Sequence, residues 1–404
     1  MATLTIKNVG PIKSIENLEL NKVNVFMGPQ SSGKSTIAKI ISFCTWLEKK
    51  MAREGYFNNS HDNIWRLEEL KTYHRLTNGY FSEKSVIYYE GESIKCSLEG
   101  EDKRTITHKL GSRVFSSKVM YIPAERNFVS VIPNLQEYLE NRDSIQDFIN
   151  SWFEAKRTYN DENKLPILNL GTQYYSDSND NDLITHDDGV KLKLQSASSG
   201  LQSIIPLLAL FEYNVIGLYG KSRPMSVKDR DALIGKYNEM LKRRIEAEES
   251  IDSKDLEELL DLILSKNYIN SKIIIEEPEQ NLFPSTQKEL IYYLLKLLNF
   301  DRGDSVTITT HSPYILYALN NCMMGYLVDA QLQGEEKNEY FANVFPSQQA
   351  WVNPKLVSVW EIEDGKLRNI QDKGNIISEN YFDQKMTELT DEYYQMLSYY
   401  KDEE

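Results

Sequence analysis

Residues 23–36, VNVFMGPQSSGKST, constrain the fold of this chain more than any other stretch. An apolar, β-rich run at 23–27 leads into the motif Gly-x-x-x-x-Gly-Lys-Ser at 28–35, and a helix-compatible run follows at 37–41. Strand, glycine-rich turn and helix in this order are typical of a phosphate-binding P-loop. A chance glycine turn would not bring both the strand before it and the helix after it.

The residue types of this loop predict what each position does. Glycines allow successive backbone N–H groups to approach a phosphate, and the start of the following helix adds its positive end. Lys34 is expected to bridge the β- and γ-phosphates of ATP, and the Ser35 hydroxyl to hold Mg²⁺. The predicted nucleotide-binding residues of the loop are Gly28, Pro29, Gln30, Ser31, Ser32, Gly33, Lys34, Ser35 and Thr36.

Two further strands are predicted from continuous apolar runs. Residues 272–275 have the composition of a strand buried on both faces of a parallel sheet, and Glu276 and Glu277 follow at once. A second β-rich run begins at Ser305 and ends at His311. Strand, helix and strand alternate through this region, which predicts a doubly wound α/β sheet.

The residues at these two strand ends fit γ-phosphate hydrolysis, which needs a phosphate cradle, a metal and a group that orients water. Glu276 is predicted to hold Mg²⁺ in the position of a Walker B acid, and Glu277 to polarise the attacking water. His311 is predicted to donate to the γ-phosphate, because α/β sheets bind ligands at the carboxyl ends of their strands. The predicted catalytic residues are therefore Lys34, Glu277 and His311.

The composition is that of an ordinary globular chain of one large domain or two, with 404 residues, 41% apolar and 26% charged. A net charge of −14 does not favour a surface that binds nucleic acid throughout, although a local patch stays open. The best basic cluster, 236–244, is followed by acidic residues at 246–249 and favours a solvated helix face.

Localisation is predicted from what the sequence does not contain. No apolar run approaches the roughly 20 residues that span a membrane, and the first residues have no signal-peptide character. Cys44, Cys96 and Cys322 are odd in number and far apart, which indicates neither a disulfide framework nor a zinc cluster. We expect a cytoplasmic protein with no membrane partner.

The rest of the chain is predicted as a β-rich flank with helical insertions. Residues 176–189 are interpreted as a turn-rich hairpin loop rather than a calcium loop, because the Gly and the terminal Glu of a calcium loop are missing. The other predicted elements are an antiparallel pair within 3–20, strands at 86–98, 105–110 and 118–122, helices within 135–156 and then an irregular stretch, a strand running into a helix at 192–207, charged helices at 226–265, a hairpin at 356–370 and a helix at 378–400.

The last predicted helix carries apolar residues at helical spacing: Met386, Leu389, Tyr393, Met396, Leu397 and Tyr400. Such a face either docks on the core of its own chain or forms a contact in an oligomer. The sequence leaves both alternatives open.

Together these motifs resemble the ABC-type ATPase family, in the soluble branch with SMC, OLD-like and anti-phage defence ATPases, the AAA_15/AAA_21-like group. Residues 277–284, EPEQNLFP, match the pattern Pro-Glu-x-x-Leu-x-Pro that follows the strand-end acids in these families. Residues 198–202, SSGLQ, resemble the ABC signature, and 310–313, THSP, resemble the switch histidine. The resemblance covers about 1–55, 115–130, 190–212 and 270–370.

Three positions depart from the family pattern. Glu276 stands where Asp is usual and is one methylene longer. The signature lacks its second glycine. The strand that should lead to the Q-loop ends in YIPAER at 121–126, so Glu125 or Arg126 takes the place of the expected glutamine.

The resemblance implies an ABC-type P-loop NTPase head with a doubly wound, mainly parallel sheet, an antiparallel β flank and helical insertions. It also implies Mg-dependent ATP hydrolysis in a homodimer or higher homo-oligomer with composite sites, where Ser198, Ser199 and Gly200 bind the phosphate held by a partner. The predicted segments are an N-terminal ATPase lobe at 1–130, an insertion at 131–190, the signature segment at 191–212, a charged helical insertion at 213–270, a C-terminal ATPase lobe at 271–370 and a C-terminal helix at 371–404.

Three functions fit such a chain. The leading hypothesis is an ATP-driven switch whose dimerisation controls a separate nuclease-like effector in antiviral defence, since the sequence has neither a coiled-coil arm nor a nuclease module after the ATPase core. The alternative is a DNA repair or chromosome-associated ATPase that acts on DNA directly. A third is the engine of a membrane transporter, against which the insertions and the soluble-branch pattern count.

Overall fold

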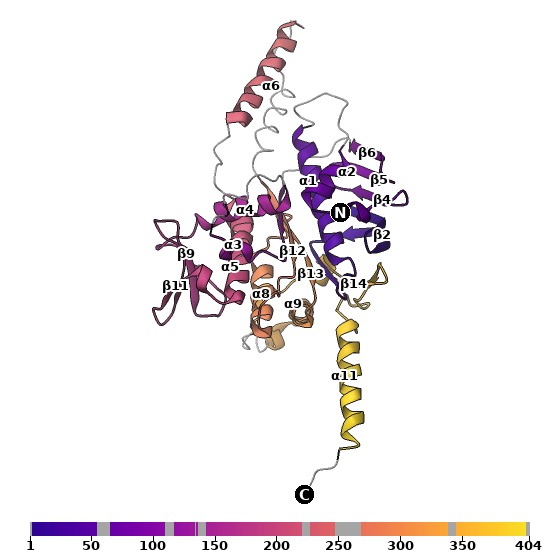
Figure 1. The fold of residues 1–404 in the computed structure, drawn as a ribbon, viewed down its shortest axis with the longest axis vertical. Coiled ribbons are helices and arrows are strands. Elements are labelled where there is room, and N and C mark those ends of the chain that lie inside the picture. The colour runs from indigo at the N-terminus through magenta and orange to yellow at the C-terminus, as the bar shows by residue number, and fades with distance from the viewer. Residues whose placement is uncertain are drawn as a thin grey trace.

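A computed structural model describes most of the chain as one body built around a large sheet (Figure 1). It describes residues 2–54, 65–109, 117–133, 135, 143–219, 227–246, 268–337 and 345–400. The eleven strands of the sheet lie in the order β6 (Lys103–His108), β5 (Ile94–Glu99), β4 (Val86–Glu90), β1 (Ala2–Val9), β2 (Ile12–Leu20), β15 (Lys366–Asn369), β14 (Val357–Glu363), β3 (Val23–Met27), β13 (Ser305–Thr310), β12 (Asn270–Glu276) and β7 (Ser117–Ile122).

The half of the sheet from β14 to β7 is parallel, as the sequence predicts. All five residues of β3 are buried, which matches its continuous apolar run. In the register of these strands, Thr310 lies opposite Met27 and Glu276 lies opposite Thr309. The carboxyl ends of β3, β13 and β12 therefore meet at one edge of the sheet.

The other half of the sheet is the predicted antiparallel flank. β1 pairs with β2 and β4, and β5 and β6 continue the meander. β14 and β15 form the predicted hairpin, whose turn residues Asp364 and Gly365 have φ angles of 51° and 71°. Positive φ at both central residues is the geometry that favours this dipeptide in tight hairpins.

Helices cover both faces of the sheet, so the predicted doubly wound arrangement is confirmed (Figure 1). The side chains of β3 alternate, with Val25 and Met27 in one core and Phe26 in the other. One core includes α1 (Lys34–Glu54) and α2 (Leu67–Tyr73); the other includes α3 (Phe128–Val131), α4 (Ser144–Lys156), α5 (Ser199–Glu212), α8 (Pro284–Leu297) and α9 (Pro313–Gln331).

The most apolar helix lies inside the protein. α5 buries nine of its residues and is continued by a π-helical turn, Tyr213–Gly217. Among the described helices, only the segment Ser199–Gly217 is long and apolar enough to cross a membrane, and 61% of it is buried. We interpret it as a core helix, because the faces of the sheet and α4 cover it.

A second, small sheet replaces the irregular stretch that the sequence predicts after α4. It has four antiparallel strands in the order β11 (Lys191–Lys193), β10 (Asp182–His186), β9 (Thr172–Ser176) and β8 (Leu165–Pro166). The predicted hairpin loop, 176–189, contains the β9–β10 turn, where Asp177 Oδ1 accepts hydrogen bonds from the backbone N–H groups of Asn179 and Asn181, each at 2.9 Å. It also contains the whole of strand β10, which the sequence did not predict. These short, polar strands carry too little apolar alternation to be distinguished from loops in the sequence.

Two helices extend away from opposite ends of the body (Figure 1). α6 (Val227–Glu246) is the first part of the predicted charged insertion; the predicted apolar positions at 256–263 lie outside the described residues. α11 (Tyr381–Leu397) is the predicted C-terminal helix, and no residue in it is buried. Docking of this helix along the core is therefore wrong, because only its first residues, Tyr381 and Phe382, pack partly against the body.

Candidate active site

The predicted P-loop connects β3 to α1 at the carboxyl edge of the sheet. Gly28 and Gly33 have φ angles of 149° and 111°, which residues other than glycine rarely adopt. A Cβ atom at Gly28 would lie 2.8 Å from the carbonyl oxygen of Ile362, and one at Gly33 would overlap Ile12. Both glycines are required by the turn itself, as the motif predicts.

Lys34 lies over this loop. Its side chain is buried, and its ammonium donates to the carbonyl oxygens of Gly28 at 2.9 Å and Pro29 at 2.7 Å. Burial lowers the pKa of Lys34 to about 8, although the nearby carboxylates, first of all Glu277, act in the opposite direction. The ammonium is therefore held where the loop is formed, next to the acids at the end of β12.

The loop fits a phosphate. The buried Ser32 hydroxyl has no hydrogen-bond partner among the described residues, the glycine positions leave no room for side chains, and α1 begins at Lys34. A phosphate at this helix start would accept from backbone N–H groups and from Ser32. The residues present therefore suit the triphosphate of ATP.

Glu276 is the last residue of β12 and is the first of the two strand-end acids. Its carboxylate is buried and accepts a hydrogen bond from the Tyr121 hydroxyl at 2.8 Å. Burial raises the pKa of Glu276. A hard cation such as Mg²⁺ would stabilise the ionised form, and the oxygens of Glu276 and Ser35 are the ligand type that it prefers. The donor set fits Mg²⁺, with phosphate oxygens and water completing the coordination.

Glu277 leaves the strand in a strained conformation and points to His311. Its φ angle is 43°, in the left-handed region, and its N–H donates to the Thr309 carbonyl at 2.9 Å. The Glu277 Oε1 atom lies 3.3 Å from His311 Nε2, and both side chains are about 30% exposed. The hydrogen bond from His311 lowers the pKa of Glu277, so the carboxylate is ionised at neutral pH and open to water.

Glu279 connects the end of β12 to the end of β13. In the sequence this residue stands out only as part of the Pro-Glu pattern. Its Oε1 accepts from the His311 backbone N–H at 2.5 Å, and burial raises the pKa of this carboxyl. The structure therefore gives Glu279 a fixed place between the end of β12 and the end of β13. The signal that could have identified it is the second acid of the 277–284 pattern.

Arg126 is the residue that joins these parts. Its side chain is fully buried at the end of β7, and burial lowers its pKa to about 10 despite the surrounding carboxylates. All of its hydrogen bonds go to backbone carbonyl oxygens: Ser203 at 3.1 Å, Pro123 at 3.3 Å, Glu276 at 2.9 Å, Glu277 at 2.9 Å and Pro278 at 3.2 Å. Arg126 thereby ties the strand-end acids to the first turns of α5.

The structure does not test whether Glu125 or Arg126 takes the role of the Q-loop glutamine, which stays a prediction. Glu125 is exposed, whereas Arg126 turns inward to the backbone. What the geometry of Arg126 supports is a positioning role.

The predicted signature residues form the start of α5. Ser198 caps the helix, with Oγ accepting from the Leu201 N–H at 3.5 Å, and Ser199 is its first residue. A Cβ atom at Gly200 would lie 2.9 Å from the Asn281 carbonyl oxygen, so the signature packs on the loop that follows the strand-end acids. The role of Ser198, Ser199 and Gly200 in binding phosphate stays a prediction.

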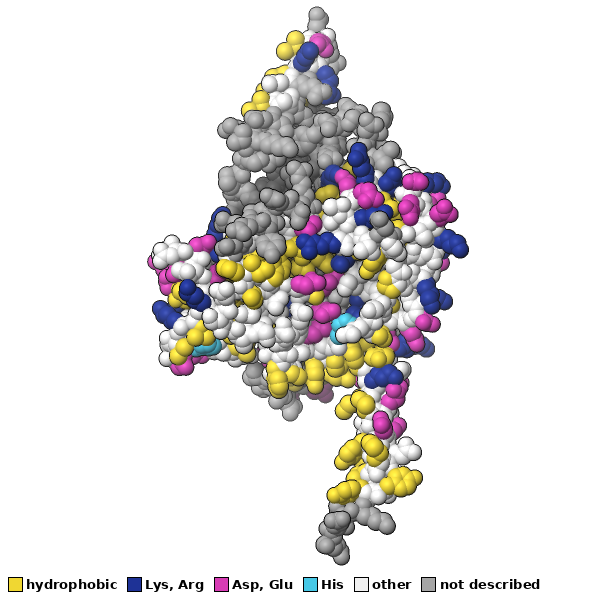
Figure 2. Space-filling view, viewed as in Figure 1, with side chains coloured by type: hydrophobic (Ala, Val, Ile, Leu, Met, Phe, Trp, Pro, Cys, Tyr) yellow, Lys and Arg dark blue, Asp and Glu magenta, His cyan; other side chains and the backbone are white. Residues whose placement is uncertain are grey.

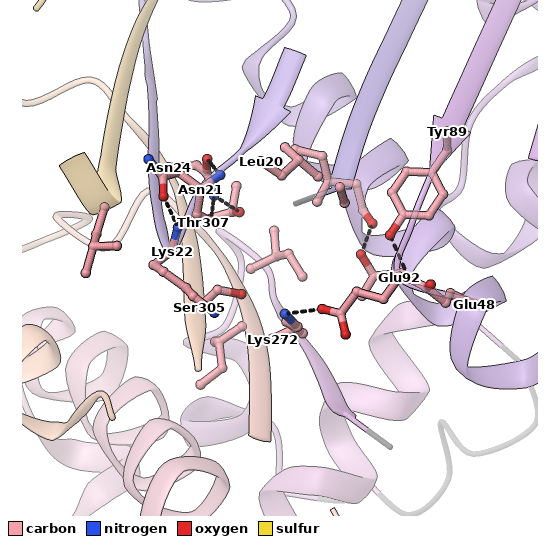
Figure 3. Close-up of a pocket in the computed structure, with 16 residues that line it drawn as sticks. Leu20, Asn21, Lys22, Asn24, Glu48, Tyr89, Glu92, Lys272, Ser305 and Thr307 are labelled. Carbon is pink, nitrogen blue, oxygen red and sulfur yellow. Dashed lines mark hydrogen bonds and ion pairs between the residues drawn. The ribbon is translucent and has the colours of Figure 1, made fainter. Parts of the chain in front are cut away.

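A separate cavity of about 290 Å³ lies at the other edge of the sheet (Figure 3). It is lined by residues at the amino ends of the central strands, including Lys22, Lys272 and Ser305. Lys272 pairs with Glu92 at 3.2 Å within it, and the buried Glu48 accepts from the Tyr89 hydroxyl at 2.8 Å. This cavity is therefore far along the strands from the P-loop and is not part of the candidate active site.

Comparison with known proteins agrees with this geometry. The family model of the AAA ATPase domain AAA_15 matches residues 236–316, a stretch that contains Glu276, Glu277 and His311. No curated protein sequence matches the chain. Over this stretch the chain is similar to AAA_15 ATPases, and the match agrees with an enzyme that hydrolyses ATP.

Solved structures of the same general type are similar to the chain at low identity. An SMC head domain from Thermotoga maritima is 11% identical, with 92% of this chain and 98% of that chain covered and a TM-score of 0.37. An SMC head domain from Pyrococcus furiosus is 10% identical, with 97% and 99% covered and a TM-score of 0.38. The recombination mediator protein RecF is 11% identical, with 91% and 97% covered and a TM-score of 0.32. These similarities are too low to carry a functional conclusion.

The pKa of Lys34 predicts a pH dependence of nucleotide binding. Because the pKa lies near 8 and phosphate binds the charged ammonium, affinity should be nearly complete at pH 7 and should fall as the pH rises through 8, by about tenfold between pH 7 and pH 9. Calorimetric titration with ATP measures this change. The control Lys34→Arg stays charged and should bind with the same affinity at both pH values. Equal affinity of the wild type at pH 7 and pH 9 would contradict the assignment.

Replacing Arg126 tests its positioning role. Lysine keeps a charge but has three donors on one atom, so Arg126→Lys leaves buried carbonyl groups without partners. We expect a loss of roughly 2–4 kcal/mol of unfolding free energy and at least a tenfold lower kcat, with ATP affinity within about threefold of wild type. Urea unfolding and steady-state ATPase assays measure both. Arg157→Lys, at an exposed position, is the control; a variant Arg126→Lys that behaves like it would refute the role.

Proposed function

We propose that the chain is an ATP-driven switch in which two copies close around ATP and separate after hydrolysis. The observation that carries this proposal is the meeting of Lys34, Glu276, Glu277 and His311 at one edge of the sheet, with the signature of the same chain packed on the loop that follows the acids. Residues 276–281 therefore join the acids that face the nucleotide to the loop on which the signature packs.

Within one chain, each residue has a distinct task in hydrolysis. Lys34 would exchange its carbonyl partners for the β- and γ-phosphates, and Ser35 and Glu276 would hold Mg²⁺, which would neutralise the charge that develops on the phosphates. Glu277 accepts a hydrogen bond from the attacking water and orients it. His311 holds the Glu277 carboxylate through their 3.3 Å contact.

The second copy supplies the other half of the site. Ser198 caps a 14-residue helix that begins with Ser199 and Gly200, and the N–H groups and hydroxyls at this helix start suit a phosphate. In the proposed head-to-tail dimer they contact the γ-phosphate bound to the partner's P-loop. Hydrolysis removes the charge at that contact, and the two copies separate.

The output of the switch is proposed to be a separate nuclease-like effector in antiviral defence, in the cytoplasm. This part rests on the resemblance of residues 277–284 to the pattern of the soluble branch, which includes anti-phage defence ATPases. Affinity purification of the Glu277→Gln chain from its native cells with ATP should recover a nuclease, and Lys34→Ala should not. Recovery of no nuclease, or of a DNA repair complex, would contradict this assignment.

Two substitutions separate binding from turnover. Lys34→Ala removes a contact made in the ground state, so ATP affinity should fall by at least tenfold. Glu277→Gln acts mainly on water, so ATP should still bind within about threefold of wild type while kcat falls by at least a hundredfold. Equilibrium binding and ATPase assays with saturating Mg²⁺ measure the difference. If Glu277→Gln turns over at the wild-type rate, Glu276 or Glu279 must replace it as the catalytic carboxylate.

Mixing two inactive chains tests the shared site. Lys34→Ala disables the P-loop, and Ser199→Trp blocks the signature, so each chain alone should be inactive. A mixed dimer keeps one intact composite site, and up to about a quarter of the wild-type rate should return in an equimolar mixture if chains pair at random and each site works alone. The ATPase rate is measured against mixed-dimer content, determined with two affinity tags. No recovery in demonstrated mixed dimers would refute the shared site.

A further inference from the structure

α11 buries none of its residues, and its first turn contacts the described part of the body. It leaves the body after its cap at Asn380 and carries a row of exposed apolar side chains that Figure 2 shows along its length. The exposed fractions are 67% for Met386, 65% for Leu389, 57% for Tyr393 and 59% for Met396. A single helix of 17 residues is marginal in water, and most of its stability has to come from packing of its apolar face.

The apolar side chains follow the spacing of a coiled-coil seam. Within α11 they recur at alternating steps of four and three residues: Phe382, Met386, Leu389, Tyr393 and Met396, with Leu397 exposed beside them. A 3.5-residue period is what two helices need to pack together. We call the first four of these residues, Phe382 to Tyr393, the α11 seam, because all four can face the same four residues of an antiparallel copy.

We propose that the α11 seam pairs antiparallel with the α11 seam of a second copy, and that this contact needs no nucleotide. The inference goes beyond the ATP switch, because it assigns a permanent contact between copies to a surface outside the active site. It follows from the period of the seam, its exposure and the placement of charge beside it.

Charge selects one register of this pair. With Met386 opposite the partner's Leu389, Lys385 of each copy lies beside the partner's Glu392, and the other flanking pair is Asp383 with Thr390. Shifting the helices by one heptad in either direction instead places Glu392 against Glu392 or Lys385 against Lys385. A parallel pair makes no ion pair at the flanking positions. The antiparallel register with two Lys385–Glu392 pairs is therefore the complementary one.

The first turn of α11 lies near the helix that follows His311. The Tyr317 hydroxyl donates to Asp383 at 2.8 Å, and Tyr317 belongs to the first turns of α9, which begins at Pro313 just after His311. α11 extends from the body on the side away from α6 (Figure 1). Antiparallel pairing therefore places the two bodies at opposite ends of the helix pair.

The first test is self-association without nucleotide. A pair of short helices is smaller than a standard interface, so we expect a weak dimer with a Kd on the order of 10 μM. Sedimentation velocity of the full chain over a range of concentrations measures it. Leu389→Asp should weaken the dimer at least about thirtyfold, and Gln384→Asp, on the outer face of the same helix, should leave it within about threefold. A wild type that stays monomeric, or a dimer that Leu389→Asp leaves intact, would overturn the proposal.

The second test addresses the register. Lys385→Glu and Glu392→Lys should each weaken the dimer about threefold to tenfold, because like charges then meet, and the chain with both changes should recover to within about threefold of wild type. Failure of the double change to recover would overturn the antiparallel register. Circular dichroism of each variant shows that α11 and the body remain folded.

The third test measures orientation and separates this inference from the ATP switch. Spin labels at Ser398→Cys should lie about 30 Å apart or more in the antiparallel pair and within about 20 Å in a parallel one; the native cysteines are buried. Lys34→Ala should dimerise without nucleotide like the wild type, whatever happens to its ATP binding. Labels within about 20 Å of each other would overturn the antiparallel pairing.

Discussion

The candidate active site, at the carboxyl ends of β3, β12 and β13, depends on the buried guanidinium of Arg126 for its backbone geometry. Its hydrogen bonds reach the carbonyl groups of Glu276, Glu277 and Pro278, which is the point where β12 turns sharply out of the sheet. A non-glycine residue in the left-handed region costs about 1–3 kcal/mol and persists only where its surroundings fix it. Glu277 has that conformation, and Arg126 fixes its carbonyl from one side while Thr309 accepts its N–H from the other. The same guanidinium donates to the Ser203 carbonyl of α5, so it links the strand end to the predicted signature helix.

The acids at this edge differ because their surroundings differ. Burial raises the pKa values of Glu276 and Glu279, whereas Glu277 is about 30% exposed and its pKa is lowered through the hydrogen bond from His311. Environments that move neighbouring carboxyl groups apart in pKa give them separate tasks. In this chain the buried Glu276 suits a cation, Glu279 fixes the backbone of His311, and the ionised Glu277 suits water. The buried ammonium of Lys34 lies near these carboxylates and offsets part of their negative charge.

The sequence predicts the parts of this site that depend on local pattern. The P-loop, the acids after β12 and the histidine after β13 each follow a recognisable strand, and the rule that ligands bind at carboxyl ends brings them together. The contacts of Arg126, Tyr121 and Glu279 join residues far apart in the chain and leave no periodic signal. The four-stranded sheet after α4 was missed because its strands are short and polar. For α11, the spacing predicts the helix but does not say which surface covers it.

Hydrogen exchange read by mass spectrometry tests the central claim, that ATP bound at one P-loop is completed by the signature of a second copy. With Mg-ATP and the slowly hydrolysing Glu277→Gln chain, amides of residues 28–36 should be protected at every protein concentration. Amides of residues 198–203 should be protected only as the concentration rises and dimers form. Protection of 198–203 that is equal in monomers and dimers, or that is absent in dimers with a protected P-loop, would contradict the account.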